Sequence, residues 1–150
     1  MKTTFDPATR DELIQRINLL KDNSIPIWGK MNVYQMARHC NIWNEWVLGK
    51  EDCVYKQEFW GKLFGKMALK SNTKDDKPIS RNMPAGKGFT VKEKDGDFEA
   101  QIATWIQQIK AYENFSNVNF IHDFFGKMTR EQIGVFAYKH NDHHLRQFKV

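Results

Sequence analysis

Apolar residues recur at three- and four-residue steps along much of this chain, which is the spacing of one face of an α-helix. The first such stretch begins at Asp6-Pro7, an N-cap followed by proline at the first helical position, and runs to about Lys21. Asn32 can cap a second helix from Val33 to Leu48, and Gly49 provides its stop. The first third of the sequence therefore predicts two amphipathic helices.

Three further segments carry the same spacing. One runs from Glu58 to Leu69, although Gly61 and Gly65 weigh against it because glycine destabilises a helix interior. Another begins at Asp97 and reaches about Tyr112. The last begins at Thr129-Arg130-Glu131-Gln132, which fits a capping box, and ends close to the C-terminus.

Two segments lack this periodicity. The residues from Lys70 to Gly96 predict a long connection, which is typical either of a lid over a site or of a solvated basic loop. Asn114 to Phe125 is predicted as a loop, and no stretch alternates convincingly as a strand would. We therefore predict an all-α fold with residues 1–150 as a single domain. Its economical architecture is a four-helix bundle with an extra short helix and a long crossover loop.

Composition narrows the function classes. Hydrophobic residues make up 41% and charged residues 27% of the 150, as in globular rather than disordered chains. The net charge of +5 forms no basic stripe, so nucleic acid is not an expected partner. No apolar run approaches the roughly 20 residues that span a bilayer, and no export signal is visible. Cys40 and Cys53 form no CxxC pair. We therefore expect a cytoplasmic protein that has no membrane partner.

The candidate chemistry lies in the last predicted helix, in the stretch Tyr138-Lys139-His140-Asn141-Asp142-His143-His144-Leu145-Arg146-Gln147-Phe148. His140 and His144 share one helix face, roughly 6 Å apart along the axis, so both imidazoles can reach one metal ion. His39, on or beside the apolar stripe of the second helix, is the candidate third ligand. The alternative for His39 is a core-edge histidine that bonds a carbonyl.

Such a site suits zinc or nickel, with iron(II) as a further possibility. His143 points about 100° away from His144, so we expect it to be a supporting or surface residue. His122, in the loop before the last helix, could reach the site. Asp142 and Glu45 are candidates to orient a ligand imidazole.

Three segments carry a family resemblance. They are Trp28-Gly29-Lys30-Met31 leading to Ala37-Arg38-His39-Cys40, then His122-Asp123-Phe124-Phe125-Gly126, and then the stretch from Tyr138 to Phe148. Together they resemble the DinB/YfiT-like superfamily of metalloenzymes, and more narrowly its DUF1569 branch. The resemblance implies an up-down-down-up four-helix bundle, a divalent metal bound by His39, His140 and His144, and in several relatives a homodimer.

Better-understood relatives are transferases and isomerases that use low-molecular-weight thiols such as bacillithiol or mycothiol. Their final histidine is followed directly by Arg-Gly-Gln or Arg-Gly-Asn, whereas Leu145 here precedes Arg146-Gln147. Two hypotheses follow. The first is a metal-dependent enzyme, either a thiol S-transferase or a hydrolase, that acts on a small molecule. The second is a non-enzymatic protein, either a stress-related binding module or a bundle with structural histidines.

Overall fold

The computed structural model of the protein describes residues 1–50, 53–83, 86 and 88–150. The elements in chain order are α1 (Pro7–Ile17), α2 (Val33–Leu48), α3 (Phe59–Thr73), α4 (Phe98–Ala111), the short 3-10 helix η1 (Tyr112–Asn114), β1 (Ile121–His122), β2 (Gly126–Lys127) and α5 (Arg130–Gln147). The prediction of a mostly helical chain is confirmed. Within the described residues, no helix has the length and apolar character needed to cross a membrane.

Side-chain chemistry sets where the helices begin. The Asp6 side chain accepts a hydrogen bond from a backbone N–H in the first turn of α1. On α2, the side chains of Asn32 and Gln35 each accept from the other's backbone N–H, and Thr129 and Gln132 repeat this reciprocal capping box on α5. These caps satisfy N–H groups that lack partners within the helix, so all three helices begin where the sequence predicts.

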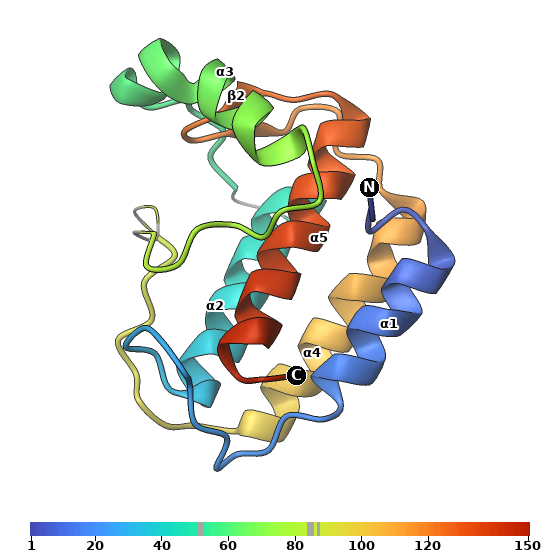
Figure 1. The fold of residues 1–150 in the computed structure, drawn as a ribbon, viewed down its shortest axis with the longest axis vertical. Helices are drawn as coiled ribbons and strands as arrows, with labels where there is room; N and C mark the ends of the chain where they lie inside the picture. The colour runs from blue at the N-terminus through green and yellow to red at the C-terminus, as the bar shows by residue number, and fades with distance from the viewer. Residues whose placement is uncertain (51–52, 84–85, 87) are drawn as a thin grey trace.

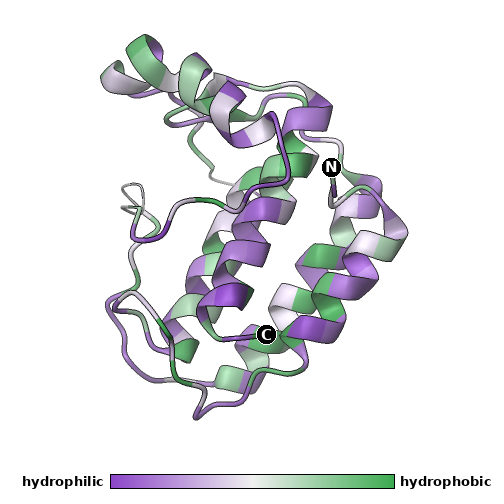
Figure 2. Ribbon diagram, in the orientation of Figure 1, coloured by the Kyte–Doolittle hydropathy of each residue, from purple (hydrophilic) through white to green (hydrophobic). Residues whose placement is uncertain are grey.

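Helices α1, α2, α4 and α5 lie side by side, and α3 lies across one end of them (Figure 1). α2 packs against both α4 and α5, and α1 packs against the same two helices. In Figure 1, α1 and α5 run in one direction while α2 and α4 run in the other. Hydrophobic and hydrophilic residues are interspersed along each of these helices (Figure 2). Their apolar faces meet in one core, whose fully buried members include Leu13, Ile17, Met36, Val47, Trp105, Ile109 and Leu145.

A short hairpin precedes α5 where the sequence predicts only a loop. Ile121 pairs with Lys127 and His122 with Gly126 in antiparallel register. Each strand is two residues long, which is too short for apolar and polar residues to alternate detectably. The prediction of a loop over residues 114–125 is therefore wrong for β1.

Glycine spacing explains why α3 forms and where it packs. A Cβ atom added at Gly61 would lie 2.4 Å from the carbonyl oxygen of Phe124, and one added at Gly65 would lie 2.1 Å from it. The two glycines thus let the helix backbone approach the hairpin turn more closely than any other residue would. This close packing offsets their poor helix propensity. α3 also continues to Thr73, into the stretch predicted as a connection.

A buried polar network ties three helices together in the core. The Trp105 indole N–H on α4 donates to Asn141 Oδ1 on α5 at 2.6 Å. The Tyr112 hydroxyl donates to Asn44 Oδ1 on α2 at 2.8 Å, and the two asparagine amides face each other. All four side chains are fully buried, so these hydrogen bonds fix how α2, α4 and α5 sit against one another.

Candidate metal centre

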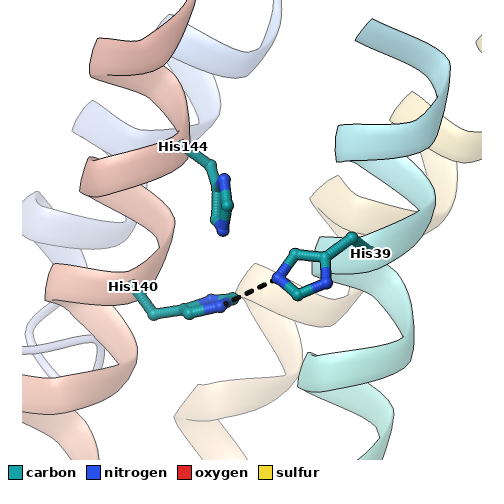
Figure 3. A group of neighbouring side chains, drawn as sticks. All are labelled: His39, His140 and His144. Atoms are coloured by element: carbon teal, nitrogen blue, oxygen red, sulfur yellow. Dashed lines mark hydrogen bonds between the residues drawn. The ribbon is translucent and has the colours of Figure 1, made fainter. Parts of the chain in front are cut away.

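Three imidazoles from α2 and α5 converge inside the molecule. His39 projects from α2 toward His140 and His144 on α5 (Figure 3). One ring nitrogen from each residue can be chosen so that all three lie within 4.8 Å of one another. The Nε2 atoms of His39 and His140 are 3.3 Å apart. The sequence-based prediction that these residues meet is confirmed, and their service as metal ligands stays a prediction.

Hydrogen bonds at Nδ1 orient the rings of His39 and His144. His39 Nδ1 lies 2.7 Å from the carbonyl oxygen of Phe89, and His144 Nδ1 lies 3.1 Å from Gln147 Oε1. A carbonyl oxygen only accepts, so each Nδ1 carries the hydrogen and each Nε2 keeps a free lone pair. The carbonyl bond expected of a core-edge histidine therefore exists at His39, and it leaves the Nε2 lone pair of this ring available to a metal ion.

Gln147 is the orienting residue that the sequence analysis missed. Its Nε2 donates to the carbonyl oxygen of Trp28 at 2.8 Å, which fixes the amide oxygen toward His144. A Cβ atom at Gly29 would lie 2.6 Å from Gln147 Nε2, so the glycine leaves room for the amide. The available signal was the three-residue step from His144 to Gln147, which places both on one helix face.

The two acidic residues proposed for this orienting role serve elsewhere. Asp142 accepts hydrogen bonds from Arg16 at 2.8 Å and from Arg146 at 2.7 Å. Glu45 pairs with Lys50 at 2.9 Å. The prediction that either carboxylate orients a ligand imidazole is wrong, because among the described residues the imidazoles of His39 and His144 bond Phe89 and Gln147 instead.

His140 lies between Trp43 and His39. Its ring stacks on Trp43 with centroids 4.1 Å apart, and its Nδ1 is buried without a hydrogen-bond partner among the described residues. Two imidazole nitrogens bound to one zinc ion at about 2.0–2.1 Å lie about 3.0–3.4 Å apart. The 3.3 Å separation from His39 fits that value. The three nitrogen donors therefore suit a divalent ion, and the His39–His140 pair already has the spacing of two bound ligands.

Burial keeps these imidazoles neutral, which is the form that binds metals. It lowers the pKa of His39, partly offset by the hydrogen bond to Phe89. Burial, reinforced by repulsion from the neighbouring histidines, lowers the pKa values of His140 and His144 well below the usual 6.5. At neutral pH the site therefore offers uncharged nitrogen donors.

The metal-free protein should lose stability on mild acidification. At pH values between the lowered pKa values and 6.5, the three histidines bind protons in the unfolded chain but not in the folded one. The free energy of unfolding should thus fall as the pH drops from 7 to 5.5, by up to about 1.4 kcal/mol per pH unit for each such histidine. Urea unfolding in the presence of a chelator measures this slope, and His140→Gln should reduce it. Equal stability at both pH values would contradict the argument.

A cavity of about 480 Å³ opens beside the three histidines. Its described lining is mainly apolar and aromatic, including Met31, Trp43, Ile79, Phe89, Phe125 and Phe136. Cavities of this size and character hold small organic molecules. The three histidines are among its lining residues, so a molecule inside it would meet them.

The segment predicted as a connection supplies part of this cavity wall. Ile79, Met83 and Phe89 line the cavity, and the Lys139 ammonium holds the segment by donating to the carbonyl oxygens of Asp75 and Lys77. These contacts favour the interpretation of residues 70–96 as a segment that covers a site over the interpretation as a solvated loop. Residues 84, 85 and 87 of this segment lie outside the described part of the chain.

The two remaining histidines line the cavity but lie outside the three-histidine group. His143 packs edge-on against Trp28, with ring centroids 5.8 Å apart. His122 Nδ1 accepts a hydrogen bond from the backbone N–H of Phe124 at 3.1 Å, which holds it in the hairpin turn. Both residues can therefore contact a molecule in the cavity.

Comparison with known proteins gives one finding. A protein-family model described as "Protein of unknown function (DUF1569)" matches residues 2–150. No curated protein and no solved structure matches the chain.

Proposed function

Because the chain belongs to the DUF1569 family, whose function is unknown, we propose a function from the site itself: a metal-dependent enzyme acting on a small molecule. The proposed ligands are His39, His140 and His144. The observation that carries the proposal is the convergence of three neutral imidazoles, two of them aimed by hydrogen bonds on their outer nitrogens, beside an apolar cavity.

The arrangement of the helices supports a matching proposal for the fold. We infer that residues 1–150 form one domain, an up-down-down-up four-helix bundle of the DinB/YfiT-like type. The mutual packing of α1, α2, α4 and α5 and their running directions support this inference. Ligands contributed by two facing helices are also common in metal sites built into bundles.

Each part of the site has a proposed task. The three histidines would hold zinc or nickel, with iron(II) as the alternative. When bound, such an ion supplies Lewis acidity and lowers the pKa of a coordinated water or thiol. Trp43 and Phe89 exclude bulk water from the histidines, and the rest of the cavity positions the substrate. A hydrolase and a transferase using a low-molecular-weight thiol both fit this scheme.

A structural role for the histidines is the second candidate. A hydrogen bond from His140 to His39 through their Nε2 atoms would account for two of the rings without any ion. The metal reading gives the convergence of all three rings a purpose, so we prefer it.

Elemental analysis tests the proposal directly. Protein purified without a histidine tag is expected to contain about one transition-metal ion per chain. Its X-ray absorption edge would identify the element. Adding that ion to chelator-treated protein should raise the midpoint of thermal unfolding. Protein that takes up none of zinc, nickel or iron(II), with an unchanged midpoint, would exclude the metal-dependent function.

A further inference from the structure

Helix α3 turns its apolar side away from the protein. Phe59, Trp60, Leu63, Phe64 and Met67, here called the α3 outer face, are 73%, 62%, 65%, 44% and 69% exposed. The side that α3 buries consists of Gly61, Gly65 and Leu69 instead. Five large apolar side chains within nine residues of one helix are a concentrated patch, and such patches mark interaction sites.

The position of α3 leaves this face accessible. The helix lies at one end of the molecule, beyond the four helices that pack side by side (Figure 1). Hydrophobic residues run along it in Figure 2. Because the glycines already anchor α3 to the hairpin turn, its aromatic side chains are not needed to hold it in place.

Charge distinguishes between possible occupants of the face. Lys62, Lys66 and Lys70 follow at four-residue steps, so they form one row along the flank of the apolar patch, and α3 contains no acidic residue. Beyond the helix the charge is mixed, because Lys56 and Lys74 are accompanied by Glu58, Asp75 and Asp76. A second copy would bring an equally basic helix against this row. An anionic surface complements it.

We propose that the α3 outer face docks onto the surface of an anionic lipid bilayer. Tryptophan and phenylalanine beside a lysine row are the composition of helices that lie in the headgroup region, with the apolar side chains in the acyl boundary and the ammonium groups on lipid phosphates. The sequence analysis expected no membrane partner because no segment spans a bilayer. Docking of this kind uses no spanning segment and does not depend on the metal site.

The docked orientation would bring the cavity close to the lipid. Ala68 and Asn72 of α3 line the cavity, and Phe124, on which the two glycines pack, lines it as well. The helix that carries the outer face is therefore also a wall of the apolar cavity.

Vesicle flotation of the full chain tests the proposal. The protein should float with vesicles of phosphatidylcholine mixed with phosphatidylglycerol and remain unbound with phosphatidylcholine alone. Trp60→Ser/Leu63→Ser should lower the partition coefficient at least about 10-fold. Lys62→Glu/Lys70→Glu should do the same. Lys66 is left unchanged because its ammonium donates to the Lys127 carbonyl oxygen.

Matched variants separate docking from general effects. Val118→Ser removes an apolar side chain that is 85% exposed elsewhere, and Lys21→Glu/Lys110→Glu makes the same charge change at two exposed positions outside α3. Both should bind vesicles like the unmodified protein. The proposal is overturned if the unmodified protein does not float with anionic vesicles. It is also overturned if the outer-face variants bind vesicles as well as the unmodified protein does. A third contrary result would be an unmodified protein that does not bind vesicles but forms a dimer, with the outer-face variants monomeric.

Discussion

Alanine at His140 is expected to lower the affinity for a divalent ion by more than about 100-fold. Loss of a residue that merely orients a ligand costs about 10–100-fold in metal affinity, and His140 is proposed to be a ligand itself. The same loss is expected for His39→Ala and for His144→Ala, because each removes one of three donors. Competition of the chelator-treated protein against a zinc-binding dye measures the affinity.

Two other histidines provide the matched controls. His122 and His143 line the same cavity but do not belong to the three-histidine group, so their replacement by alanine should change the affinity less than about 3-fold. Gln147→Leu should fall between the two classes, since it removes only the hydrogen bond that orients His144. If His140→Ala and His143→Ala bind zinc equally well, the site is not the one proposed.

The candidate ligands were predictable because helical periodicity decides which side chains share a face. The four-residue step placed His140 and His144 together, and the apolar stripe of α2 directed His39 inward. Gln147 was not predicted as a positioning residue. Its role depends on the Trp28 carbonyl oxygen, 119 positions away, and the sequence gives no measure of that approach.

The fold shows the same division between local and distant causes. Capping residues predicted the starts of α1, α2 and α5, because a cap acts within three residues of itself. α1 ends at Ile17 rather than at about Lys21, since a turn takes over the last residues. The support that the hairpin turn gives to α3 could not be seen in advance, because it comes from residues about 60 positions later.

The exposed side of α3 also shows where an amphipathic pattern misleads. Its apolar residues have helical spacing, and the usual inference would place them in the core. The glycines reverse that assignment, because two residues without side chains allow the closest backbone approach and so decide which side packs. Spacing thus predicted the helix correctly, whereas residue size determined its orientation.

Alanine at Asn141 is expected to destabilise the protein by about 3–5 kcal/mol. The substitution leaves the buried Trp105 indole N–H without an acceptor and the Asn44 amide without its partner. Each buried group left unpaired costs about 1–3 kcal/mol, and the vacated space adds to the loss. That is a large fraction of the 5–15 kcal/mol typical of a folded domain. Urea unfolding followed by circular dichroism measures the change.

Comparison variants isolate the network from the loss of an amide in general. Asn114→Ala, at an exposed position, should change the free energy of unfolding by less than about 0.5 kcal/mol. Combining Asn141→Ala with Trp105→Phe should cost less than the sum of the two, because both remove the same hydrogen bond. Additive losses would refute the network. Since Asn141 follows His140 and contacts Asn44 on α2, the bonds that stabilise the core also hold His140 against His39.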